Sequence, residues 1–243
     1  MGLMVLALGA IPARAATESD TLQKVSFEDH GTFERAVITL GEGSVPGDFA
    51  PTFSSSYRDG DSLARIKLPT VTKSLKTDGA GLSRAISRYY IVRSPGAARS
   101  LFVDFHLKGA AKSVSVYKLD NPVRIVIDVT PGGTMLLPKP ATGARTVVTG
   151  PRARSLAGPR TFIVTGYGRP PEARGAWRIK NADGRVVRQG AYTTSDWAAT
   201  WGSFKFSASY PSRLSGRRGT LQVGELSARD GRFRGVSVPM RFR

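Results

Sequence analysis

The stretch Leu101-Phe102-Val103-Asp104-Phe105-His106-Leu107 alternates two sets of side chains. The residues at its odd-numbered positions are all apolar, whereas Asp104 and His106 belong to the other set. Because successive side chains of a strand point to opposite faces, this alternation predicts a strand with one dry face and one wetter face. Such strands are typical of antiparallel sheets covered on one side. The stretch therefore favours an all-β fold.

Short alternating runs recur on both sides of this stretch. Two lie before it, and six follow it within the last 100 residues or so: 35–40, 64–68, 161–165, 175–180, 185–192, 203–210, 220–226 and 237–242. Asp183-Gly184 between two of the later runs predicts a tight hairpin, since this pair readily takes positive φ. Many short strands separated by turn signals predict β-sandwiches. Residues 81–90 carry the best helical spacing, but their β-branched and aromatic end could equally begin a strand.

Breaker residues divide the chain in two. Residues 131–144 hold Pro131, Pro138, Pro140 and several glycines. Proline lacks the amide hydrogen that a strand ladder needs, so we expect a linker there. The prediction is two β-sandwich domains, 24–130 and 145–243, joined by a Pro/Gly linker.

The first 15 residues have the pattern of a targeting segment. An apolar run, residues 2–12, precedes Ala13-Arg14-Ala15, which is typical of a signal peptide and its cleavage site. The run has about half of the ~20 apolar residues that a membrane span needs. We expect export with cleavage after Ala15, no transmembrane segment, and an extracytoplasmic, cell-wall-associated protein. No basic residues precede the run, so a start further upstream or an uncleaved N-terminal segment is the alternative.

Positive charge is concentrated in the second half. The chain has 36 Lys and Arg against 18 Asp and Glu. Residues 1–143 hold 17 basic and 13 acidic residues, a net +4, whereas residues 144–243 hold 19 and 5, a net +14. Arg outnumbers Lys by 26 to 10, which suits bidentate contacts to phosphate or carboxylate, although a genome rich in Arg codons gives the same composition.

Candidate binding residues follow from the same pattern. In the run 175–180, Trp177 and Ile179 are expected in the core, with Arg178 projecting outward. The residues predicted to contact anionic groups are Arg174, Arg178, Arg185 and Arg188. Trp197 lies in an expected loop and is the best candidate for an exposed aromatic contact.

The sequence holds few candidate residues for catalysis or metal binding. The chain has no Cys, which excludes disulfides, thiolate zinc sites and cysteine nucleophiles. Its two His are too few for most metal or triad chemistry. Ser115 and Lys118 match S-x-x-K, but on a strand these two side chains point to opposite faces. His106 and Asp104 could form an oriented base, yet an ordinary polar strand face is the simpler interpretation. We expect no catalytic residue, metal or cofactor.

The first domain resembles a known family. Residues 119–129, LDNPVRIVIDV, are similar to the closing motif of the amidase N-terminal (AMIN) domain, in which a Pro precedes a strand ending Val-Ile-Asp-Val. Residues 33–38 and 102–105 stand where AMIN-like domains place their opening and penultimate strands. The resemblance implies a β-sandwich that localises proteins in the bacterial envelope by binding peptidoglycan, and it transfers no catalytic residues.

The second domain looks like the immunoglobulin-like domain of bacterial spore germination proteins. The matching pieces are 149–152, 164–168, 183–187, 201–204, 219–223 and 228–231. The resemblance implies an immunoglobulin-like sandwich and does not imply sporulation. The strong positive charge and the missing lipidation Cys depart from relatives.

These observations predict an exported, non-catalytic envelope protein. It would bind or scaffold peptidoglycan or other anionic envelope polymers, and envelope proteins are further possible partners. One alternative is an accessory protein that positions a separate cell-wall hydrolase. Another is a basic nucleic-acid-binding protein, suggested by an isoelectric point near 10.9, although the export signal argues against nucleic acid.

Overall fold

The computed structural model describes residues 19–47, 51–82, 84–96 and 98–243. The predicted signal peptide, 1–15, lies outside the described residues. Strands dominate, and the helical pieces among the described residues are two short 3₁₀ turns, Pro171–Ala173 and Ser212–Leu214. The all-β prediction is therefore confirmed. Within these ranges no helix has both the length and the apolarity to span a membrane.

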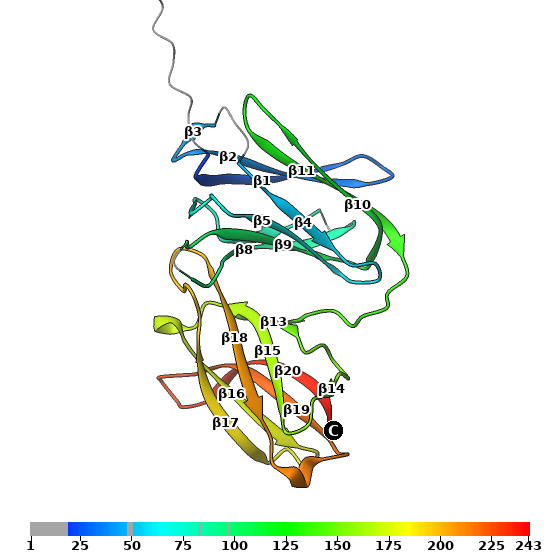
Figure 1. Cartoon of the computed structure of the whole chain (residues 1–243), viewed down its shortest axis with the longest axis vertical. Helices are drawn as coiled ribbons and strands as arrows, with labels where there is room; N and C mark the ends of the chain where they lie inside the picture. Colours follow the sequence, from blue (N-terminus) through cyan, green and yellow to red (C-terminus); the bar gives the residue numbers. More distant parts are fainter. Residues whose placement is uncertain (1–18, 48–50, 83, 97) are drawn as a thin grey trace, which may run out of the picture.

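The first domain is a sandwich of two sheets (Figure 1). Its strands are β1 (Thr21–Asp29), β2 (Glu34–Glu42), β3 (Val45–Pro46), β4 (Ser54–Tyr57), β5 (Leu63–Leu68), β6 (Lys73–Ser74), β7 (Asp78–Ala80), β8 (Ile86–Arg93), β9 (Leu101–Leu107), β10 (Ala110–Leu119) and β11 (Arg124–Gly133). One sheet has the order β10-β11-β2-β1-β6, with β3 beside β2, and the other contains β8-β9-β5-β4, with β7 beside β8. Alternate side chains of both sheets, such as Ile38, Ile66, Phe105 and Ile127, fill one apolar core.

The second domain is also a sandwich. Its strands are β12 (Ala141–Thr142), β13 (Thr146–Gly150), β14 (Leu156–Ala157), β15 (Thr161–Gly168), β16 (Arg174–Asn181), β17 (Val186–Thr193), β18 (Trp201–Ser209), β19 (Arg218–Leu226) and β20 (Phe233–Phe242). The sheet β14-β20-β19-β16-β17 faces the strands β12-β13-β15-β18. All six runs predicted after residue 160 are strands. Gly184 has φ 79°, as the predicted hairpin turn requires.

The segment 81–90 resolves in favour of a strand. Strand β8 begins at Ile86, and most of its side chains are buried on both faces. A register shift between Ile86 and Arg88 brings Ile86 and Tyr89 into the same core although they are three residues apart, so this pair matches helical spacing within a strand. The β-branched and aromatic residues 90–92 then favour the extended conformation.

One sheet runs through both domains. Strand β18 pairs in parallel with β8, matching Trp201 to Val92 and Gly202 to Arg93. This pairing joins the first-domain strands and the second-domain strands into a nine-stranded sheet. A Cβ on Gly202 would overlap the backbone of Asp196, so the close approach of that loop requires glycine. We call the contact region between the two domains the seam; it lies at the middle of Figure 1.

The connection between the domains is held against the first domain. Strand β11 runs through Pro131 to Gly133, and the chain then crosses to β12. The backbone amides of Leu136 and Leu137 both donate to the carbonyl of Gly60. Lys139 Nζ donates to the carbonyl of Lys108 at 2.6 Å. These bonds fix the connection in place.

The predicted wetter face of β9 is wrong, because all seven residues of β9 are buried. The second domain covers the face that carries Phe102, Asp104 and His106. An apolar cluster closes the seam there and contains Tyr90, Val92, Phe102, Val147, Tyr167 and Trp201. Val147, Tyr167 and Trp201, all from the second domain, supply the cover.

Candidate functional site

A buried polar network lies at the seam, on strand β9. The side chain of Asp104 is fully buried and accepts two hydrogen bonds from Arg65, at 2.6 and 2.8 Å. Tyr167, from the second domain, also hydrogen-bonds Asp104. The Tyr167 hydroxyl lies 2.6 Å from His106 Nε2. The polar residues expected on the wetter face, Asp104 and His106, are therefore buried and have hydrogen-bond partners within the seam.

The electrostatics of this network oppose nucleophilic catalysis. Burial lowers the pKa of His106 to about 3, so the imidazole is neutral. Burial also raises the pKa of the Tyr167 hydroxyl well above 10. An activated nucleophile needs the reverse, a hydroxyl that loses its proton readily to a nearby base. Asp104 hydrogen-bonds Arg65 and Tyr167, and His106 contacts the Tyr167 hydroxyl, so these bonds do not make the alternative of an Asp104–His106 base.

The other candidate catalytic motif is separated by its strand. Ser115 and Lys118 lie on β10, where they pair with Asp128 and Ile125 of β11. Residues three apart on a strand point to opposite faces, which confirms that the S-x-x-K match does not bring serine and lysine together. Among the described residues, no three His, Asp or Glu side chains gather in a way that could hold a metal ion.

Arg93 fastens the second domain to the first at the seam. Its Nε donates to Asp196 Oδ2 at 2.8 Å, and the hydroxyls of Ser195 and Ser203 both donate to the Arg93 carbonyl. Burial alone would raise the pKa of Asp196, but hydrogen bonds from Arg93, Thr200 and backbone amides outweigh burial and lower it to about 2. Asp196 is thus a carboxylate at all ordinary pH values.

Trp197 lies in the loop that Asp196 organises. Its side chain is 44% exposed, and its backbone amide donates to Asp196 Oδ1 at 2.6 Å. Arg169 Nε donates to the Trp197 carbonyl at 3.2 Å. The predicted loop position and exposure are confirmed, and a role of Trp197 in binding stays a prediction.

The four predicted arginines do not form one cluster. Arg174 and Arg178 share a face of β16, whereas Arg188 lies opposite Ile179 on the edge strand β17 and Arg185 lies in the hairpin turn. Arg174, Arg185 and Arg188 are exposed. Their placement gives scattered positive charge without a shaped site.

Arg178 is already engaged within the sheet. Its Nε donates to Gln222 Oε1 at 2.7 Å, and its guanidinium lies 4.2 Å from the centre of the Phe233 ring. Trp177 and Ile179 are buried on the other face, as predicted. Stacking on an aromatic ring still leaves part of a guanidinium for a ligand, but it fixes the side chain to one place.

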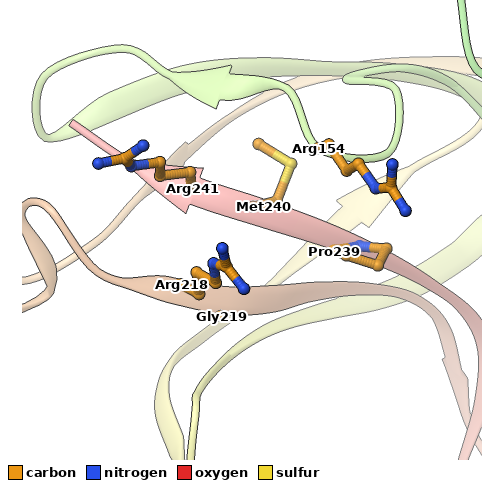
Figure 2. Close-up of a pocket in the computed structure, with 6 residues that line it drawn as sticks. All are labelled: Arg154, Arg218, Gly219, Pro239, Met240 and Arg241. Atoms are coloured by element: carbon orange, nitrogen blue, oxygen red, sulfur yellow. The ribbon is translucent and has the colours of Figure 1, made fainter.

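Sequence reasoning missed a hollow on the sheet β14-β20-β19. Its volume is about 510 Å³, and its lining includes three arginines, Arg154, Arg218 and Arg241, together with Gly219, Pro239 and Met240. Figure 2 shows Arg218 and Arg241 on neighbouring strands and Arg154 on the loop at the other end of the hollow. We call these three residues the arginine hollow.

The arginine hollow has no internal counter-charge. In the described part of the chain, none of the three arginines takes part in an ion pair. Arg218 and Arg241 are direct partners in the register of β19 and β20, so two like charges face each other across the strands. Like charges in that position destabilise a sheet. Guanidinium groups only donate hydrogen bonds, so the ligand that fits them is an anion.

Strand register created this pair, and single-sequence patterns do not give register. Positions 218 and 241 are 23 residues apart, and the alternation in each strand says only that both side chains point outward. Arg154 reaches the hollow because its backbone amide donates to the Pro239 carbonyl at 2.7 Å. The available signal was the excess of Arg in residues 144–243.

A family model matches most of the second domain. Residues 146–232 match the family model described as the immunoglobulin-like domain of bacterial spore germination. The match begins with β13 and ends just before β20, which confirms the predicted resemblance over those strands. The AMIN resemblance of residues 24–130 stays a prediction. No curated protein and no solved structure matches the chain.

Proposed function

We propose that this chain is an exported, non-catalytic protein that binds anionic polymers of the bacterial cell envelope. The observation that carries the proposal is the state of the charges in the second domain. Four of its 19 Lys and Arg residues form ion pairs, and the remainder have no carboxylate partner within the described residues. Unpaired surface cations attract polyanions with a salt-sensitive affinity.

The first domain offers a different kind of surface. A hollow of about 490 Å³ lies between β4 and β10, the edge strands of the two sheets. Its lining includes the hydroxyl residues Ser55, Ser56 and Ser113 and the charged residues Asp59 and Lys112. Hydroxyl and charged side chains match the hydroxyls and amides of a wall glycan, in keeping with the resemblance to AMIN domains. We propose that this domain contacts glycan while the second domain holds acidic groups.

The seam supports a scaffolding role. A shared sheet and the ion pairs Arg93 with Asp196 and Arg152 with Asp61 keep the two domains in one orientation. Two binding surfaces at a fixed separation gain affinity for a polymer that reaches both. Positioning of a separate wall hydrolase is compatible with this arrangement, and capture of such an enzyme by the immobilised protein tests it.

Sedimentation with purified cell walls tests the proposal. Raising the salt from about 0.1 M to about 1 M shortens the screening length from about 10 Å to about 3 Å, so binding should weaken steeply over that range. Binding that is absent at low salt, or unchanged at high salt, rejects the proposal. N-terminal sequencing of the mature protein tests export, with a new terminus after Ala15 as the expected result.

A further inference from the structure

We infer that Arg154, Arg218 and Arg241 form a two-point site for a polymer with repeated phosphate groups. This inference rests on the proposed function, because it gives the second domain a specific site and a ligand class. It differs from general electrostatic adhesion, in which every exposed arginine contributes alike. The geometry of the hollow supports each step.

The first binding point is the pair Arg218 and Arg241. Both side chains are exposed, and their register places the two Cβ atoms about 4.5–5.5 Å apart. Like charges on directly opposed residues of a sheet repel each other in the free protein. An anion bound between them reduces this repulsion, which makes binding more favourable.

The second binding point is Arg154. Two backbone hydrogen bonds join the loop that carries it to β20. The amide of Arg154 donates to the carbonyl of Pro239, and the amide of Arg241 donates to the carbonyl of Ser155. Arg154 has φ 64°, in the left-handed region that favours glycine. Arg154 therefore places a charged side chain at one rim of the hollow, at a position whose backbone conformation favours glycine.

The directions of the two points favour a ligand longer than a single small anion. Positions 239 and 241 lie about 6.6 Å apart along the strand, and Arg154 is attached at the first of them. In Figure 2 the guanidiniums of Arg154 and Arg241 point away from each other, toward opposite ends of the hollow. They contact different acidic groups. The ligand consequently carries at least two such groups along an extended chain.

The paired arginines favour phosphate over carboxylate. One guanidinium satisfies both oxygens of a carboxylate through a bidentate contact. A phosphate group within a polymer carries two unbridged oxygens on a tetrahedral phosphorus, so two neighbouring guanidiniums can approach the same group from different directions. A row of phosphates therefore matches the paired arginines better than a row of carboxylates does.

Calorimetric titration of the full chain with inorganic polyphosphate tests the site. The variant R218Q/R241Q removes the first point, and R174Q/R185Q removes the same charge from exposed arginines outside the hollow. We expect affinity to fall roughly tenfold or more in R218Q/R241Q, as for lost hydrogen bonds to charged groups, and less than about threefold in R174Q/R185Q. Equal losses in both variants overturn the site, because only net charge would then matter.

Two further titrations test the shape of the ligand. Arg154→Gly removes the second point, so it should weaken polyphosphate binding and leave inorganic phosphate binding unchanged. Polyglutamate should bind the wild-type protein more weakly than polyphosphate of matched charge. Equal affinity for the two polymers overturns the choice of phosphate.

Cell walls and DNA separate the two sources of repeated phosphates. Hydrofluoric acid strips phosphate polymers from walls, so wild-type protein should bind untreated phosphate-containing walls more tightly than stripped walls or a DNA fragment. If R218Q/R241Q still binds untreated walls like the wild type, the site fails and the proposed function stands. If wild-type protein binds polyphosphate and DNA but no walls, the site stands and the envelope role fails.

Discussion

At the seam, three arginines each donate to a carboxylate: Arg65 to Asp104, Arg93 to Asp196 and Arg152 to Asp61. At the arginine hollow, three arginines face solvent with no carboxylate partner in the described chain. Arginine therefore has two different roles in this molecule. A paired and buried guanidinium is committed to the fold, whereas an unpaired and exposed one remains available for a ligand.

The largest expected effect comes from breaking a seam pair. Asp196→Ala leaves the Arg93 guanidinium, which is 7% exposed, without its carboxylate. Loss of one partner of a buried ion pair costs about 3–5 kcal/mol. The free energy of unfolding from urea titration should fall by that amount. Asp59→Ala, at an exposed turn, serves as the control, and a similar small loss in both variants would show that the Asp196 pair does not hold the seam.

The next effect is a dependence of stability on pH. His106 has a pKa of about 3 in the folded protein and about 6.5 when unfolded. As the pH falls below 6.5, His106 binds a proton in the unfolded state but not in the folded state. The free energy of unfolding therefore falls by about 1.4 kcal/mol per pH unit down to about pH 3. His106→Gln keeps a hydrogen-bonding nitrogen and should lose this part of the slope. Identical slopes between pH 6 and pH 4 in both proteins would contradict burial of a neutral imidazole.

The smallest effect has the opposite sign. Arg218→Gln removes one of two like charges that face each other across β19 and β20. The free protein should become more stable by about 0.2–1 kcal/mol at low salt, and the gain should shrink as salt screens the pair. Thermal unfolding at two salt concentrations measures this, with Arg174→Gln as the matched control. A loss of stability in Arg218→Gln would mean that this arginine supports the fold.

Local patterns predicted the local structure. Period-two alternation located the strands of the second domain, and Asp183-Gly184 located their hairpin. The same patterns predicted that Trp177 and Ile179 point inward. These predictions depend on neighbouring residues alone, which is why one sequence suffices for them.

Features made by distant parts of the chain were not predictable in this way. The wetter face of β9 became a buried face because Tyr167 and Trp201 cover it. The pairing of Arg218 with Arg241 depends on the register of two strands, and the position of Arg154 depends on a backbone hydrogen bond. The excess of Arg in residues 144–243 was visible in the sequence, but the grouping of Arg154, Arg218 and Arg241 around one hollow depends on the fold.

Retention on phosphate-containing cell walls compares the arginine hollow with the rest of the surface most directly. Wild-type protein, R218Q/R241Q and R174Q/R185Q are sedimented with the same walls at one moderate salt concentration. We predict that R174Q/R185Q is retained nearly like the wild type and that R218Q/R241Q is largely released. Equal retention of all three proteins, or equal release of both variants, would contradict a specific role for the unpaired arginines of the hollow.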